Sequence, residues 1–138
     1  MSSDDCIFCK IIAGEASAYR VYEDEHTLAF MDVFPATDGH VLVVPKRHAE
    51  NIFELEPEEV AAVARSAQTI AKAIRKVWAP DGLTVSQANG AAAGKTVGHY
   101  HVHLIPRREG QPRRGHGDRA ADPEPLAQLA RELSEALS

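Results

Sequence analysis

The sequence predicts an α+β fold, with an antiparallel sheet of about five strands, one long helix and shorter terminal helices. Three observations lead to this prediction. Short apolar runs before residue 45 and after residue 83 have the length of strands. One long amphipathic stretch lies between the two groups, and the links are short, which favours an antiparallel arrangement. Because 138 residues suit one core, we expect residues 1–138 to form a single domain.

The first third of the chain is expected to hold a short helix and three strands. The apolar residues of segment 6–13 have the spacing of one side of a short helix, which Gly14 ends. A loop marked by Pro35, Asp38 and Gly39 precedes the third strand, which is apolar enough to be central. The three expected strands cover residues 19–23, 27–32 and 40–45.

The clearest helix covers residues 57–78. Pro57 suits its first turn and is followed by two glutamates, while Arg75 and Lys76 lie in its last turn. These charges complement the positive and negative ends of the helix dipole. An apolar stripe that would pack against the sheet is formed by Val60, Val63, Ala64, Ala67, Ile70, Ile74 and Val77.

Two strands and a last helix are expected after a turn at residues 79–82. The fourth strand covers residues 83–88, and a loop of small residues, 89–94, leads to the fifth strand. From Pro123 a last helix places its leucines on one side, with Asp122 as the expected cap.

Charge and composition exclude several classes of protein. The net charge of −5 gives no argument for nucleic-acid binding, and no apolar run approaches the ~20 residues that cross a bilayer. The short acidic N-terminus is not a signal peptide, so we expect a cytoplasmic protein without membrane or nucleic-acid partners. Residues 107–119 are rich in Gly and Arg, and we expect either a flexible solvated loop or a mobile basic flap over an anionic ligand.

Three histidines alternate along the fifth apolar run. In a strand, His99, His101 and His103 point to one face, and each imidazole can ligate a metal or attack an electrophile near neutral pH. The outer two are roughly 13 Å apart at the backbone, whereas a zinc–nitrogen bond is about 2 Å, so the three cannot easily share one ion. We infer that the histidine at one end of the row binds a metal or supports the fold, and that the other histidines take part in the reaction. The side chains expected on the other face are Tyr100, Val102 and Leu104.

Two further segments suggest a metal or an anion. Cys6 and Cys9 are the two cysteines of the chain, and their spacing is that of a redox pair, of half a metal site, or of an accident. The loop at residues 89–96 combines small residues with Lys95 and Thr96, which suits an anion, most simply a phosphate. The loop lacks the spacing of a P-loop, but beside the histidine row it suggests phosphorus chemistry.

Four segments together resemble the histidine triad (HIT) superfamily of nucleotide hydrolases and transferases. The signature is similar to GKTVGHYHVHLIPR at residues 94–107. The likeness continues in DDCIFCKI at 4–11, AFMD at 29–32 and GHVLVVPKRH at 39–48, and it covers roughly residues 4–107. Because the cysteines come first, the chain looks most like the small bacterial zinc-containing branch, whose fold agrees with the α+β prediction.

The resemblance implies a hydrolase that attacks the α-phosphorus of a nucleotide. In this family the middle histidine, here His101, is the nucleophile of a covalent nucleotidyl intermediate that water then breaks. His103 would contact the phosphate oxygens, and His40 matches a fourth active-site histidine. The expected substrates are nucleoside phosphoramidates or dinucleoside polyphosphates. Two alternatives remain open: a nucleotide-binding scaffold with weak catalysis, and a metal-dependent hydrolase that uses the histidine row.

The resemblance also implies binding residues, a structural zinc and a homodimer joined through its sheets and long helices. Asp32 would hold the ribose, and the phosphate contacts would come from Asn89, Lys95 and Thr96. Lys95 stands where the family usually has Gln, which adds a charge and removes an acceptor. The apolar slot for the base would be formed by Ile7, Phe8, Ile11, Phe30 and Val33. The expected zinc ligands, a closed tetrahedral set, are Cys6, Cys9, His48 and His99.

Overall fold

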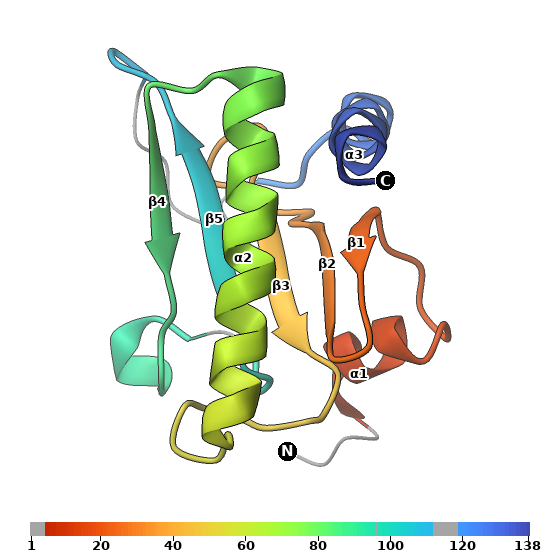
Figure 1. Cartoon of the computed structure of the whole chain (residues 1–138), viewed down its shortest axis with the longest axis vertical. Helices are drawn as coiled ribbons and strands as arrows, with labels where there is room; N and C mark the ends of the chain where they lie inside the picture. Colours follow the sequence, from red (N-terminus) through yellow and green to blue (C-terminus); the bar gives the residue numbers. More distant parts are fainter. Residues whose placement is uncertain (1–4, 96, 112–118) are drawn as a thin grey trace.

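The computed structural model describes residues 5–95, 97–111 and 119–138, which contain a five-stranded antiparallel sheet (Figure 1). The strand order across the sheet is β1-β2-β3-β5-β4. The strands are β1 (Arg20–Glu23), β2 (Thr27–Met31), β3 (Val41–Pro45), β4 (Gly82–Ser86) and β5 (Val102–Arg107). The helices are α1 (Ile7–Ile12), α2 (Pro57–Trp78), the short 3₁₀ turn η2 (Ala91–Ala93) and α3 (Pro123–Leu137). The predicted fold class is confirmed.

The fifth strand begins later than the sequence analysis predicts. Its ladder starts at Val102, so His99 and His101 lie in the segment before it. There the Tyr100 N–H donates to the Ala49 carbonyl at 2.7 Å, in the loop after β3, instead of to a neighbouring strand. The predicted alternation still holds, because the three apolar residues expected on the other face are all buried beneath α2: Tyr100, Val102 and Leu104.

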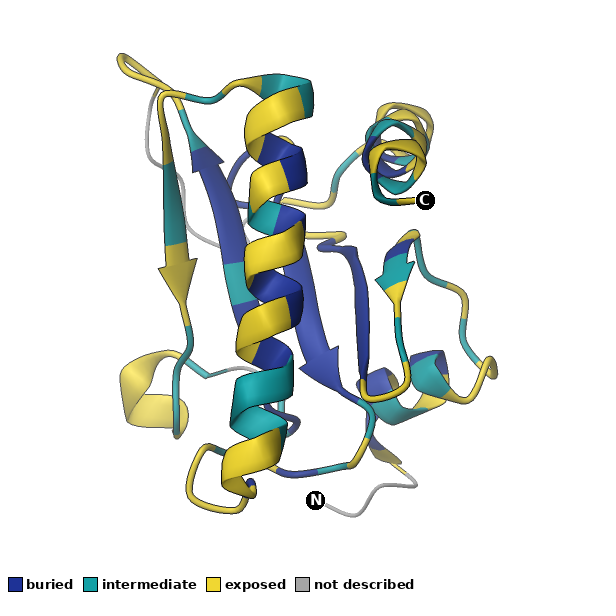
Figure 2. Cartoon of the chain, viewed as in Figure 1, coloured by how far each residue is buried: buried dark blue, intermediate teal, exposed yellow. Residues whose placement is uncertain are grey.

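The sheet has helices on both faces. α2 and α3 cover one face, over a large apolar cluster, and the outward side of α2 is exposed along its length (Figure 2). α1 covers part of the other face, over a smaller cluster that includes Phe8, Phe30 and Leu42. The two faces therefore have separate apolar clusters, and α1 belongs only to the smaller one.

The long helix matches its predicted bounds, and its buried stripe differs in detail. Its first turn has Pro57 and a capping box between Glu56 and Glu59, which satisfies backbone N–H groups at that end. Ala64, expected in the stripe, is exposed, whereas Ser66 is buried. Ser66 lies inside because its hydroxyl bonds to Thr27 Oγ1 at 2.7 Å and to Asp24 Oδ2 at 3.1 Å, which compensates for its burial.

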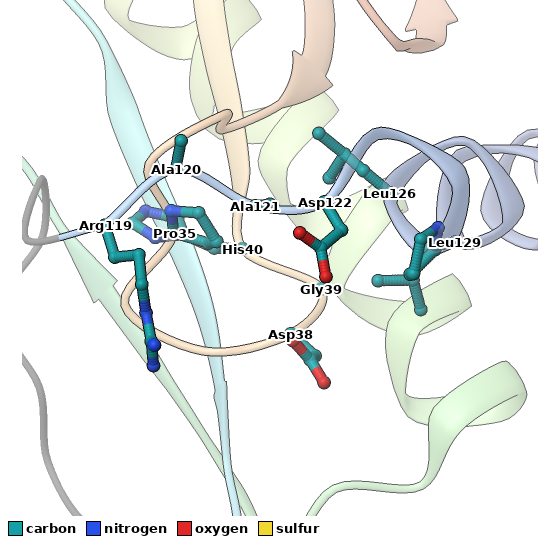
Figure 3. A pocket seen from close by; sticks show the side chains of 11 residues that line it. Pro35, Asp38, Gly39, His40, Arg119, Ala120, Ala121, Asp122, Leu126 and Leu129 are labelled. Atoms are coloured by element: carbon teal, nitrogen blue, oxygen red, sulfur yellow. The ribbon is translucent and has the colours of Figure 1, made fainter.

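The last helix is tied to the loop between β2 and β3. The Ala121 N–H donates to the Val33 carbonyl at 2.9 Å, just before α3 begins. Asp122 has the predicted N-cap position, and its side chain makes no capping hydrogen bond. Its carboxylate is directed toward the loop at Asp38 and Gly39 instead (Figure 3).

The same loop is held from the other side by the end of α2. Gly39 has φ of +91°, and a Cβ there would lie 2.8 Å from a ring carbon of Trp78. The Trp78 indole N–H in turn donates to Glu132 of α3 at 3.0 Å. This close approach needs a glycine, and it fixes the backbone next to His40.

Among the described residues, no helix is long and apolar enough to cross a membrane. Of the Arg- and Gly-rich segment, Arg107 is the last residue of β5 and donates to Thr84 Oγ1 at 3.1 Å. Residues 112–118, and the predicted phosphate contact Thr96, lie outside the described residues.

Candidate functional site

An apolar cavity of about 490 Å³ opens on the face of the sheet that α1 covers. Asp32 and His101 contribute polar atoms to its lining. A largely apolar cavity with a few polar groups is typical of a small-molecule site. The lining also contains all five residues that the sequence analysis assigned to the base slot: Ile7, Phe8, Ile11, Phe30 and Val33.

The backbone sets the protonation of His101. Its Nδ1 lies 2.7 Å from the His99 carbonyl, which can only accept, so Nδ1 carries the proton. In the neutral ring the electron pair is then on the other nitrogen, Nε2. The ring is buried, with the edge of Phe8 at a centroid distance of 5.3 Å and His103 at 4.9 Å. In its neutral form, His101 therefore has its nucleophilic nitrogen at Nε2.

His40 and His103 form a hydrogen-bonded pair beside it. The Ala36 N–H donates to His40 Nδ1 at 2.9 Å, so neutral His40 carries its proton on Nε2. That proton is donated to His103 Nδ1 at 2.9 Å, which places the His103 proton on its own Nε2. They meet because His103 pairs with Leu42, two residues after His40 on the same face. The two rings form a relay whose outer end is an N–H donor.

Asp32 completes this group from the end of the neighbouring strand. Met31 pairs with Val41, so the next residues outward, Asp32 and His40, face one another. Asp32 is buried; its Oδ1 accepts from the Phe34 N–H at 2.8 Å, and its Oδ2 lies 3.6 Å from His40 Nε2. The carboxylate is thus fixed at the edge of the cavity, where it can accept hydrogen bonds from hydroxyl groups.

Asp32, His40 and His103 are close enough to one another to be considered as metal ligands. The donor chemistry of His40 disagrees with that role. Its Nδ1 accepts from a backbone N–H, so a neutral ring keeps its proton on Nε2, the atom that faces the group. We therefore interpret the three residues as a hydrogen-bonded relay.

A second group has the geometry of a metal centre. The ligand atoms of Cys6, Cys9, His48 and His99 all lie within 4.8 Å of one another. His48 Nδ1 is 3.2 Å from both His99 Nδ1 and Cys9 Sγ, and Cys6 Sγ is 3.4 Å from His99 Nδ1. Zinc bonds of about 2.0–2.3 Å in a tetrahedron place their ligand atoms roughly 3.3–3.8 Å apart. The four residues therefore fit a zinc ion.

Protonation in this group agrees with metal binding. The Nε2 of His99 donates to the Pro45 carbonyl at 2.9 Å, so Nδ1 presents its electron pair to the group. Burial lowers the pKa of His99 to about 4, which keeps the ring neutral at pH 7. Burial and the neighbouring Cys6 raise the pKa of Cys9 to about 11, so a cation is needed to hold its thiolate.

The predicted phosphate loop is only partly placed at the site. Lys95 is half-buried and close enough for its charge to lower the pKa of His99, although burial is the larger cause. Asn89 accepts from the Ile52 N–H at 2.8 Å and pairs with the Gln87 amide through both its polar atoms. In this arrangement the Asn89 side chain joins two loops, and its contact with phosphate remains a prediction.

Two features at the site were not predicted from the sequence. Phe34 lines the cavity at its mouth and is 46% exposed, beside the exposed Ile7 and Val33. An aromatic residue in a loop directly after a predicted ribose carboxylate is a signal that could have identified it. A second cavity of about 390 Å³ lies behind His40, between its loop and the start of α3, with Arg119 on its wall (Figure 3).

Comparisons with known proteins give a consistent result. A family model described as the HIT domain matches residues 13–110. The protein hit of Bacillus subtilis is 49% identical over 105 residues, which cover 76% of this chain and 72% of that protein. An adenylylsulfatase of Arabidopsis thaliana is 42% identical over 106 residues, covering 77% of this chain and 54% of that protein. A zinc-bound histidine triad family protein from Mycobacterium smegmatis has a crystal structure that matches with a TM-score of 0.86 at 39% identity, covering 99% and 95% of the two chains.

Proposed function

This chain belongs to the HIT family, and from that premise we propose that it is a nucleotide hydrolase whose nucleophile is His101. The observation that carries the proposal is the state of that ring. Its Nδ1 is committed to the His99 carbonyl, and the nitrogen left with an electron pair belongs to a residue that lines the apolar cavity. A similar adenylylsulfatase supports a nucleotide as the substrate.

The proposed reaction has two displacements at the α-phosphorus. His101 Nε2 attacks phosphorus, a phosphorus–nitrogen bond forms, and the bond to the leaving group breaks with its electron pair. The His103 Nε2–H, backed by His40, can supply the proton that the leaving group needs. Water then attacks the same phosphorus and returns a proton to His103 Nε2, the phosphorus–nitrogen bond breaks, and the nucleoside monophosphate leaves with His101 and His103 restored.

The remaining residues would bind the substrate. The apolar cavity takes the base, and Asp32 accepts hydrogen bonds from the ribose hydroxyls. We assign phosphate contacts to Asn89, Lys95 and Thr96, together with His103. The substrate classes we propose are nucleoside phosphoramidates and dinucleoside polyphosphates, and we propose that the whole chain works as one HIT domain.

We also propose a structural zinc ion on Cys6, Cys9, His48 and His99. The fit of their distances to a tetrahedron and the zinc-bound relative support it. Four protein ligands leave no open position, so the ion would stabilise the segment around α1 and would not activate water. Because the proposed chemical step does not use the zinc ion, it should still occur in chelated protein.

A homodimer is the assembly that we propose. Strand β4 is an edge strand, and Val85 on it is 58% exposed. Beside it an apolar groove of about 390 Å³ runs between α2 and the sheet. A second copy that pairs at this edge would cover the groove with its own α2 and would also cover an otherwise open strand edge.

The decisive experiment replaces the proposed nucleophile. His101→Ala and His101→Gly should abolish release of monophosphate from an adenosine phosphoramidate and from diadenosine polyphosphates, while circular dichroism stays unchanged. His26→Ala, which removes an exposed histidine that does not line the cavity, is the matched control and should keep full turnover. Mass spectrometry of quenched wild-type protein should find an adenylyl group on His101.

Each other outcome identifies a different function. Full turnover in His101→Ala would contradict the mechanism. Tight nucleotide binding with negligible turnover on every substrate would favour a scaffold protein. Activity that disappears on chelation, in protein that still folds and still binds nucleotide, would favour a metal-dependent hydrolase.

A further inference from the structure

We propose that Phe8 is a positioning residue that couples the Cys/His metal group to the nucleotide cavity, so that metal and nucleotide strengthen one another's binding. The inference rests on the proposed function, because it takes the apolar cavity as the nucleotide site. It concerns a linkage between two sites, in which Phe8 acts through its neighbours.

The first argument is that one short helix serves both sites. Cys6 is the N-cap of α1 and Cys9 lies within it, and both belong to the metal group. Ile7, Phe8 and Ile11, from the same turn and a half, line the cavity. A six-residue helix is not stable by itself, so its position depends on what holds it. Ligands that fix Cys6 and Cys9 must also fix the wall of the cavity.

The second argument is the position of the Phe8 ring. It is almost fully buried, and it meets the His99 ring edge-on at a centroid distance of 5.9 Å and the His101 ring at 5.3 Å. Its third ring neighbour is Phe30, at 5.4 Å, on the cavity wall. One rigid side chain therefore contacts a metal-group residue, the proposed nucleophile and the base slot. Such T-shaped pairs add to the energy of burial and prefer one geometry.

A backbone contact supplies a parallel connection. The His99 carbonyl accepts from His101 Nδ1 at 2.7 Å, while the His99 ring points into the metal group. A displacement of His99 would therefore move the acceptor that sets the proton of the nucleophile. Phe8 packs on both of these rings, so it limits the movement of His99 relative to His101.

The linkage should be local to one face of the sheet. Cys6, Phe8 and Ile11 belong to the smaller apolar cluster, whereas the larger cluster beneath α2 and α3 contains no residue of α1. Removal of the metal should loosen α1 without unfolding the rest. Couplings of this kind are typically roughly 5–150-fold in affinity, and thermodynamic linkage requires the same factor in both directions.

The test measures both directions on the full-length protein. Calorimetric titration with AMP should give at least about fivefold tighter binding to zinc-loaded protein than to chelated protein. Competition with a chromophoric chelator should show zinc bound more tightly, by the same factor, when AMP is saturating. Circular dichroism should show that chelated protein keeps its fold.

Phe8 variants decide whether this residue carries the linkage. In Phe8→Ala, zinc should no longer change the affinity for AMP, and AMP should no longer change the affinity for zinc, so both affinity ratios should be close to one. Phe8→Leu keeps most of the apolar volume, so it should still bind zinc and AMP, with a reduced affinity ratio. Phe53→Ala is the matched control, because Phe53 is 84% exposed, and it should keep the wild-type factor. A change in kcat alone would not distinguish a loss of positioning by Phe8 from general damage to the site. The affinities for AMP and for zinc, each measured with and without the other ligand, do distinguish them.

The outcomes separate the two proposals. Equal AMP affinity with and without zinc, global unfolding on chelation, or an unchanged factor in both Phe8 variants would each overturn the linkage. Failure of AMP to bind zinc-loaded wild-type protein would instead overturn the proposed function on which it rests.

Discussion

At the scale of single residues, three histidines of one segment differ because their backbone partners differ. The His99 ring donates through Nε2 to Pro45, which leaves Nδ1 facing the Cys/His group. The His101 ring donates through Nδ1 to His99, which leaves Nε2 for the chemistry that we propose. His103 accepts at Nδ1 from His40. The same side chain therefore suits three different proposed roles, each determined by where a carbonyl, an N–H or another ring lies.

A charged pair next to a proposed metal ligand leads to a prediction at this scale. Arg47, which precedes His48, holds Glu59 with two hydrogen bonds of 2.6 and 2.7 Å. The Arg47 bonds, together with a hydrogen bond from the Glu56 backbone N–H, lower the pKa of Glu59 from 4.5 to about 2. The pair therefore stabilises the folded state above pH 4.5, and this contribution is lost as the pH falls toward 2.

Arg47→Gln should lower the free energy of unfolding at pH 7 only slightly, because solvent screens a pair that is this exposed. The difference from wild type should shrink between pH 4.5 and 3, as measured by urea denaturation at several pH values. Lys72→Gln is the control, at an exposed position of α2, the helix that contains Glu59. It should have little effect on the free energy of unfolding at any pH. A difference that stays constant with pH would contradict this account.

At the scale of elements, the loop between β2 and β3 shows how packing positions a site. It lies between Trp78 at the end of α2 and the segment that leads into α3, and it carries His40 into the relay. Thr37 Oγ1 adds a bond of 2.7 Å to the Pro106 carbonyl of β5. Three elements thus fix a segment that has no regular structure of its own.

Gly39→Ala should disturb this arrangement twice. The positive φ is unfavourable for alanine, and the added Cβ would meet Trp78 at 2.8 Å. We expect the free energy of unfolding to fall by at least about 2 kcal/mol, together with a lower kcat because His40 is the next residue.

Urea denaturation and turnover measure these effects, and Gly14→Ala is the control. Gly14 has a φ of +79° but open space around its Cβ position, so that variant has only the backbone cost of about 1–2 kcal/mol. A loss at position 39 no greater than at position 14 would show that contact with Trp78 does not matter.

At the scale of the whole molecule, the two faces of the sheet have different tasks. One face holds the larger core with α2 and α3, and the other holds the cavity, the relay and the metal group around α1. The edge strand β4 borders an apolar groove, which is the surface that we assign to a second copy. The catalytic and assembly surfaces that we propose therefore use different parts of the fold.

Val85→Lys should shift the protein from dimer to monomer, because a lysine would lie unpaired within an apolar interface. Sedimentation velocity over a range of concentrations measures the shift. Thr69→Lys adds the same charge at an exposed position of α2 outside the groove and should leave the assembly unchanged. A wild-type protein that is monomeric at all concentrations would contradict the dimer.

The sequence by itself determined the order of elements, the five strands, the bounds of the long helix and the residue types of the site. Local spacing carries this information, since apolar periodicity and the dipole-matched charges of residues 57–78 act within one element. The resemblance to the HIT family indicated which of these residues to assign to the site. The start of the fifth strand was predicted wrongly, because a backbone hydrogen bond to a distant loop prevailed over local preference.

Only the tertiary structure decided which atoms meet and in which protonation state. His99 and His48 are 51 residues apart, and His40 and His103 are 63 apart, yet each pair lies in hydrogen-bonding range. Distant partners set the protons of two rings, the Pro45 carbonyl for His99 and the His40 ring for His103, whereas His101 and His40 use backbone groups two and four residues away. The sequence therefore supplied the histidines and two of their near partners, and the packing of distant segments brought the rings together.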